Sequence, residues 1–263
     1  MITDIETYLH SLFEDIVTLN IRGKGIKFLP DLTRFKKLKE LNCSNNQLTY
    51  LPTLPQNLEV LYCYDNQLTY LPTLPQNLKI LGCSHNQLTY LPTLPQNLEK
   101  LYCYDNQLTW LPTLPQNLET FGCYENQLIL LPTLPQNLRT LGCHNNQLTW
   151  LPTLPQNLET LGCSHNQLTG LPTLPQNLKL LSYINNPIYE IVNNNCLFQT
   201  KQNIKILNNF RHLYYCIKFK KQLRKWLWEK VREPNIQNKY NPKYLIENLG
   251  EEDDLDTVLN NWK

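Results

Sequence analysis

The sequence predicts an α/β solenoid, in which short strand-and-turn units stack into one parallel β-sheet. The octapeptide LPTLPQNL first begins at Leu51 and recurs every 20 residues until Leu171, without an insertion. Within each unit, apolar residues alternate with polar ones, as at Leu61 and Cys63, which is the period of a strand with one buried face. Because a 20-residue unit cannot bury that face alone, successive units must stack and pair their strands in parallel.

The repeat defines three parts of the chain. Each unit reads L-x-x-L-x-C-x-x-N-Q-L-x-x-L-P-T-L-P-Q-N, and diverged copies that keep the apolar spacing flank the regular ones. We therefore expect an N-terminal cap in residues 1–15, about nine repeats of 20–22 residues in 16–195, and a helical C-terminal cap or tail in 196–263. Ile5, Leu9 and Phe13 have helical spacing within the N-terminal cap.

The asparagine and the prolines of each unit have separate roles. The asparagine falls where the strand ends, where a buried amide can bond backbone groups of its own turn and of the next. The prolines exclude a helix from the outer side and favour a polyproline-like conformation there. A thin outer side predicts a curved arc with the sheet on its concave face. The expected amide ladder is Asn46, Asn66, Asn86, Asn106, Asn126, Asn146, Asn166 and Asn186.

This pattern resembles the leucine-rich-repeat family, and within it the short class with L-P-x-L-P-x-x-L units found in bacterial type III effectors. The resemblance covers about 180 of the 263 residues. It implies a binding scaffold. Some members of that class carry a C-terminal ubiquitin-ligase domain with a nucleophilic cysteine, but the 68 residues after Asn195 are too few for such a domain.

Charge and hydropathy limit the other classes of function. The net charge is +2 with 17% charged residues, which argues against nucleic-acid or membrane binding by the whole molecule. The acidic N-terminus lacks the basic and apolar regions of a signal peptide, and no window is apolar enough for a membrane span. We therefore expect a soluble, intracellular protein.

Seven of the nine cysteines share one repeat column. The strand alternation directs that column inward, where a free cysteine behaves as a small hydrophobic residue. His85 and His165 follow Cys83 and Cys163 by two residues, but a thiol in a dry core is unreactive. No spacing suits a metal, so we expect no catalytic residue, no metal and no cofactor. The column comprises Cys43, Cys63, Cys83, Cys103, Cys123, Cys143 and Cys163.

The concave face is where we expect binding. Tyrosines from the third to the sixth unit cluster there, and tyrosine supplies large, stiff contact area to protein interfaces. Gly82 and Gly122, which lie between tyrosines, are expected to leave gaps for a partner's side chains. Alternatively, duplication copied the tyrosines and they stack on one another. The candidate residues are Tyr62, Tyr64, Tyr102, Tyr104 and Tyr124, with His85 and an acidic rim of Asp65, Asp105 and Glu125.

A second column of large side chains leads towards the convex side. We expect its members to pack between neighbouring units. This column comprises Tyr50, Tyr70, Tyr90, Trp110, Leu130 and Trp150.

The C-terminal part holds a basic stretch. From Cys196 to Tyr240 there are eleven Lys or Arg and two acids, and apolar residues recur at helical spacing over 201–232. Two more helices are expected, near Pro242 and in LDTVLNNW. The basic helix is either a solvated face of the cap or a docking element for an acidic partner, RNA or an anionic membrane. Its basic patch comprises Arg211, Lys218, Lys220, Lys221, Arg224 and Lys225.

The segment RKWLWEKVREPNIQNKYNPKYLIENL resembles a terminal segment of giant-virus (Mimivirus-type) proteins. The resemblance implies a viral origin and no mechanism. We therefore predict a non-enzymatic, monomeric protein-interaction scaffold that binds a host or viral protein on its concave face, in the host cytoplasm if viral. The alternative is a binder of nucleic acid or an anionic surface through the basic helix.

Overall fold

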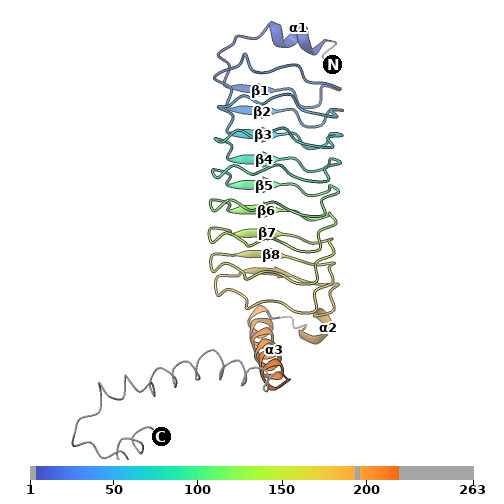
Figure 1. The fold of residues 1–263 in the computed structure, drawn as a ribbon, viewed down its shortest axis with the longest axis vertical. Coiled ribbons are helices and arrows are strands. Elements are labelled where there is room, and N and C mark those ends of the chain that lie inside the picture. Colours follow the sequence, from blue (N-terminus) through green and yellow to red (C-terminus); the bar gives the residue numbers. More distant parts are fainter. Residues whose placement is uncertain (1–3, 193–195, 219–263) are drawn as a thin grey trace, which may run out of the picture. The chain divides into compact units, whose positions relative to one another are not determined.

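The computed structural model describes residues 4–192 and 196–218, with side chains as far as residue 212. Nine three-residue strands form one parallel sheet in sequence order, and lie one above another in Figure 1. From the second strand onward, each residue pairs with the residue 20 positions later. The predicted solenoid with a parallel sheet is confirmed. The strands are β1 (Thr18–Asn20), β2 (Glu40–Asn42), β3 (Val60–Tyr62), β4 (Ile80–Gly82), β5 (Lys100–Tyr102), β6 (Thr120–Gly122), β7 (Thr140–Gly142), β8 (Thr160–Gly162) and β9 (Leu180–Ser182).

Three helices flank the strands in the described residues: α1 (Ile5–His10), α2 (Tyr189–Val192) and α3 (Leu197–Lys218). The Asp4 side chain caps α1, and Ile5 and Leu9 bury its inner face. The helix is shorter than its apolar spacing predicts, since Phe13 lies beyond it and is 82% exposed. The predicted basic helix 201–232 is described only as far as Lys218. The helices expected near Pro242 and in LDTVLNNW lie outside the described residues.

The core is a column of leucines and cysteines that runs through the stack. All seven column cysteines are fully buried, as their alternation with polar residues predicts. Burial raises the pKa of the Cys43, Cys83 and Cys163 thiols to about 12. Tyr183, directly after β9, takes the cysteine's place in the last repeat and is also buried.

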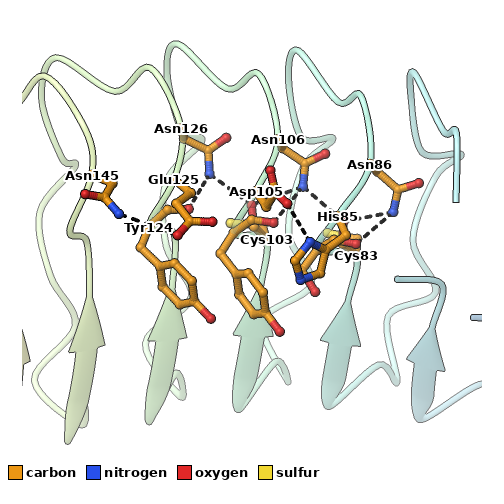
Figure 2. Close-up of polar contacts among 12 residues, drawn as sticks. Cys83, His85, Asn86, Cys103, Asp105, Asn106, Tyr124, Glu125, Asn126 and Asn145 are labelled. Carbon is orange, nitrogen blue, oxygen red and sulfur yellow. Dashed lines mark hydrogen bonds and ion pairs between the residues drawn. The ribbon is translucent and has the colours of Figure 1, made fainter. Parts of the chain in front are cut away.

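The predicted asparagine ladder is present in every repeat from Asn46 to Asn186. In the middle of the stack, Asn106 Nδ2 donates to the carbonyls of Cys103 and Tyr104 in its own turn, and of Cys83 in the preceding turn, at 3.1–3.2 Å. Asn106 Oδ1 accepts from the Leu88 amide at 2.9 Å. Figure 2 shows Asn86, Asn106 and Asn126 repeating this contact in successive turns. One amide thus satisfies backbone groups of two adjacent turns.

On the outer side of the repeats, turns take the place of helices between successive strands. Between β1 and β9, a stretch described in full, no helix lies between strands, as the prolines predict. In each regular repeat the segment Pro-Gln-Asn-Leu closes a turn, as in the Leu98 amide's bond to the Pro95 carbonyl at 3.1 Å. A second ladder follows this edge: Asn97 Nδ2 donates to the Gln76 carbonyl of the preceding repeat at 3.0 Å. Sequence reasoning missed this ladder, although its signal was the recurring Gln-Asn pair.

The asparagine ladder ends at Asn186, where Pro187 replaces the glutamine that follows each ladder asparagine from Asn46 to Asn166. In the regular repeats that glutamine's amide donates to the preceding repeat, as Gln167 does to Leu148. Pro187 has no amide hydrogen, and the Ile188 amide donates instead to the Leu168 carbonyl at 2.9 Å. The chain then enters α2. The last turn is therefore completed without a further asparagine.

We predict that Asn106→Ala lowers the free energy of unfolding by about 3 kcal/mol, because it leaves several buried backbone groups unpaired. Asn97→Ala, in the exposed ladder of the neighbouring repeat, removes one water-accessible bond and should cost about 1 kcal/mol or less. Urea unfolding followed by circular dichroism measures both. Equal losses of unfolding free energy in the two variants would contradict the role assigned to the asparagine ladder.

We also predict that the seven column thiols resist alkylation in the folded protein. Their burial excludes the reagent and holds the pKa of each above its usual value, so little thiolate forms even at mildly alkaline pH. Treatment with iodoacetamide, followed by peptide mass mapping, should modify the exposed Cys196 and leave the column unmodified until urea is added. Rapid modification of Cys83 or Cys163 in the native state would revive a thiol-enzyme hypothesis.

Candidate binding site on the sheet

The candidate tyrosines all lie on the exposed face of the sheet. Leu101 and Cys103 point into the core, so the alternating Tyr102 and Tyr104 must point outward. All five tyrosines of the candidate patch are half-buried. The structure therefore brings them onto one surface, where each remains partly exposed to solvent.

Four of the rings on this face form a continuous row, which we call the aromatic row: His85, Tyr104, Tyr124 and His144. Tyr104 stacks on Tyr124 with ring centroids 4.2 Å apart and planes 9° apart. Tyr124 stacks on His144 at 4.2 Å and 13°, and His85 meets Tyr104 edge-on at 5.2 Å. Figure 2 shows His85 and Tyr124 projecting away from the asparagine ladder. The repeat places His144 in the same column as Tyr124, but the candidate residues predicted from the sequence do not include it.

The row is tightly packed, and packing shifts the pKa of Tyr124 and of His144. Burial, and then a hydrogen bond with Tyr104, raise the pKa of the Tyr124 phenol. Burial also lowers the pKa of His144, which favours the neutral imidazole. The stacked rings thus form a neutral surface.

The gaps expected over the glycines are absent, because tyrosine rings already fill them. A Cβ atom added to Gly82 would lie only 2.9 Å from Cδ1 of Tyr62, and one on Gly122 would meet the rings of Tyr102 and Tyr124 at 3.6 Å. The tyrosine rings thus occupy the space beside the two glycines. The alternative reading, that the tyrosines stack on one another, describes the Tyr104–Tyr124 pair correctly.

The acidic rim is held by an unusual backbone conformation. The residue after each exposed column position has a positive φ of 51–56° in eight successive turns. Asp65, Asp105 and Glu125 occupy this left-handed corner, which Asp tolerates better than Glu does. His85 Nδ1 lies 2.5 Å from Asp105 Oδ2, with both side chains about half exposed. The corner therefore places carboxylates beside the aromatic row.

One arginine of the protein already lies on a tyrosine ring of this face. The guanidinium of Arg22, from the first repeat, lies over the Tyr64 ring, 5.6 Å from its centroid. Asn45 bridges the same guanidinium to the Asp65 carboxylate when its amide is oriented to satisfy both neighbours. The arginine thus makes a cation–π contact with the aromatic face, and the Asn45 amide links it to the neighbouring acidic corner.

The thiol-histidine pairs have no catalytic geometry. The Cys83 side chain faces the core, whereas His85 pairs with Asp105 at the surface. Among the described residues, no group of three or more His, Cys, Asp and Glu side chains is placed to hold a metal ion.

The second column of large side chains, from Tyr50 to Trp150, is packed between units less completely than expected. Its six members and Phe28, which precedes them in the same repeat position, remain 42–64% exposed. Packing between units therefore covers only about half of each side chain.

The basic patch is only partly described. Arg211 lies on α3, and Lys218 is the last residue of that helix. Lys220, Lys221, Arg224 and Lys225 lie outside the described residues, as does the segment that resembles giant-virus proteins. None of the helices described is both long and apolar enough to cross a membrane.

Comparison with known proteins relates the chain to bacterial effectors. A family model described as Leucine Rich Repeat matches residues 37–58 and 157–178. YopM of Yersinia enterocolitica is 41% identical with a TM-score of 0.65, over 67% of this chain and 39% of YopM. YopM of Yersinia pestis is 39% identical with a TM-score of 0.61, over 65% of this chain and 49% of that one. The chain thus spans half or less of either YopM. No curated protein matches.

The LRR domain of a Shigella effector is covered more fully than either YopM. It is 31% identical with a TM-score of 0.54, over 63% of this chain and 74% of that domain. The nine-stranded parallel sheet, the asparagine ladder and these similarities all point to the same family. The chain belongs to the leucine-rich-repeat family.

Proposed function

We propose that this protein is a non-catalytic scaffold that binds a protein partner on the exposed face of its sheet. The observation that carries the proposal is the aromatic row, whose rings are stacked before any partner arrives. Preorganised aromatic side chains lose little conformational entropy on binding, so their contact area contributes efficiently to affinity. Two of the relatives are themselves described as effectors, and the fold offers an extended binding surface.

The chemistry of the row suits a basic partner segment. Tyr104 and Tyr124 offer ring edges and phenol groups, because their faces pack on neighbouring rings, and Asp105 and Glu125 supply negative charge at the neighbouring corner. An arginine from the partner would approach these carboxylates, as Arg22 approaches the Asp65 corner through Asn45 within the chain. We therefore propose a partner that presents arginine, from the host or from a virus if the chain is viral.

Substitution of the stacked pair tests the proposal. We predict that Tyr104→Leu/Tyr124→Leu weakens capture of the partner roughly tenfold or more, because hot-spot aromatics each contribute about 2 kcal/mol. Quantitative affinity capture with immobilised wild-type protein and variant, read by mass spectrometry, measures the loss. The control Tyr70→Leu/Tyr90→Leu makes the same chemical change in the second column and should retain the partner.

Two outcomes would contradict the proposal. A partner list unchanged by the sheet substitutions would show that binding occurs elsewhere. Ligands that are nucleic acids, lost steeply between low and high salt, would favour the basic helix instead. Asp105→Asn should weaken binding of an arginine-bearing partner while the Tyr104–Tyr124 stack is kept, because it removes the charge but leaves an amide oxygen that can still accept a hydrogen bond from His85.

A further inference from the structure

The second column forms an exposed apolar stripe along one flank of the solenoid. Its members lie on seven consecutive repeats, from Phe28 to Trp150. The central ones, Tyr70, Tyr90 and Trp110, are 44%, 44% and 52% exposed, and Ile129 beside the stripe is 56% exposed. At ~4.8 Å per strand the stripe is roughly 30 Å long, and it exposes on the order of 600 Å². That is at the upper end of the largest apolar patch on a typical monomer.

From Tyr50 to Trp150 the segments that carry the stripe contain no charged residue, whereas Phe28 lies close to the exposed Lys27 and Asp31. In each of seven repeats, the 13 residues from the ladder asparagine to the leucine after the Gln-Asn pair contain no Asp, Glu, Lys or Arg, as in NQLTYLPTLPQNL from Asn86 to Leu98. Their exposed members are threonine, glutamine, asparagine and the stripe residue. Soluble proteins usually distribute charges of both signs over their surface. Aromatic enrichment with charge depletion is instead the composition of an interface core.

We propose that this flank is the interface of a symmetric dimer, in which the stripe of one copy packs against the stripe of a second copy. The absence of charge gives no means of attracting an acidic or basic partner, whereas two copies of a neutral face meet without repulsion. The stripe has the period of the repeat, and another solenoid with the same strand spacing presents side chains at that same period. The stripe side chains of two copies can therefore meet in register along the whole stripe.

The area suits a stable dimer. The stripe together with the flanking threonine and proline rows offers on the order of 800 Å² per copy, which is the usual contribution of each partner to a specific interface. A dimer of this kind replaces the monomer expected from the sequence, and leaves the sheet face of each copy open.

Symmetry specifies the contacts. In a two-fold interface a residue on the axis meets its own copy, and residues on either side meet each other. Tyr90 is the middle of the seven stripe positions. An axis at Tyr90 places Tyr70 against the partner's Trp110.

Sedimentation of the full-length chain tests the proposal. We expect wild-type protein to sediment as a dimer at micromolar concentration. Tyr70→Lys/Trp110→Lys should sediment as a monomer, because it places four ammonium groups in the interface. Thr120→Lys/Thr140→Lys adds the same charge on the sheet face and should remain dimeric, as should Tyr104→Leu/Tyr124→Leu. Matched circular dichroism spectra would show that each variant is folded.

A cysteine reporter tests the geometry. In a Cys196→Ser/Cys216→Ser background, Tyr90→Cys should form an intermolecular disulfide on mild oxidation, because its position lies on the axis. Tyr50→Cys, two repeats away, should not. A wild-type monomer throughout the micromolar range, or a dimer that survives the Tyr70→Lys/Trp110→Lys substitution, would overturn the proposal. Equal cross-linking at both positions would overturn the axis.

Discussion

Each turn of this solenoid depends on one asparagine amide at the end of a three-residue strand. A turn so short cannot pair its own backbone groups, and the core of leucine and cysteine offers them no water. The ladder amide satisfies carbonyls of two turns and one amide hydrogen, and so joins each repeat to its neighbour as well as closing it. Packing of the leucines then follows, because the turns are held in register.

The short turn at the ladder asparagine also determines the arrangement of side chains on the exposed face of the sheet. The chain must reverse direction just before the ladder asparagine, and it does so through a residue with positive φ. That corner places a polar side chain beside every exposed position of the sheet. Because the register is fixed, side chains from equivalent positions fall directly beside one another, which is why Tyr104 and Tyr124 stack. The aromatic row is thus a consequence of exact repetition in a scaffold that permits no slippage.

The strands, the ladder and the buried cysteines could be predicted from the sequence because each depends on the pattern within one repeat. What could not be predicted depends on the distance between repeats. Whether Gly82 leaves a gap depends on where the Tyr62 ring of the neighbouring turn comes to lie, and no single-repeat pattern states this. The exposure of Tyr50 or Trp110 likewise depends on how far one flank is covered by adjacent units. Phe13 fitted a helical spacing, yet α1 ends before it.

The ladder also has a direction along the chain. The amide of each turn is completed by the asparagine of the turn that follows it, as Asn106 does for Leu88, so the most recently added turn always lacks its last partner. Only the Pro187–Ile188 turn, which returns its amide to Leu168 and leads into α2, ends this requirement. During synthesis from the N-terminus, the growing solenoid therefore has one incomplete turn at its leading edge. Each new repeat stabilises the repeat made before it, and the stack closes only when its C-terminal turn has been made.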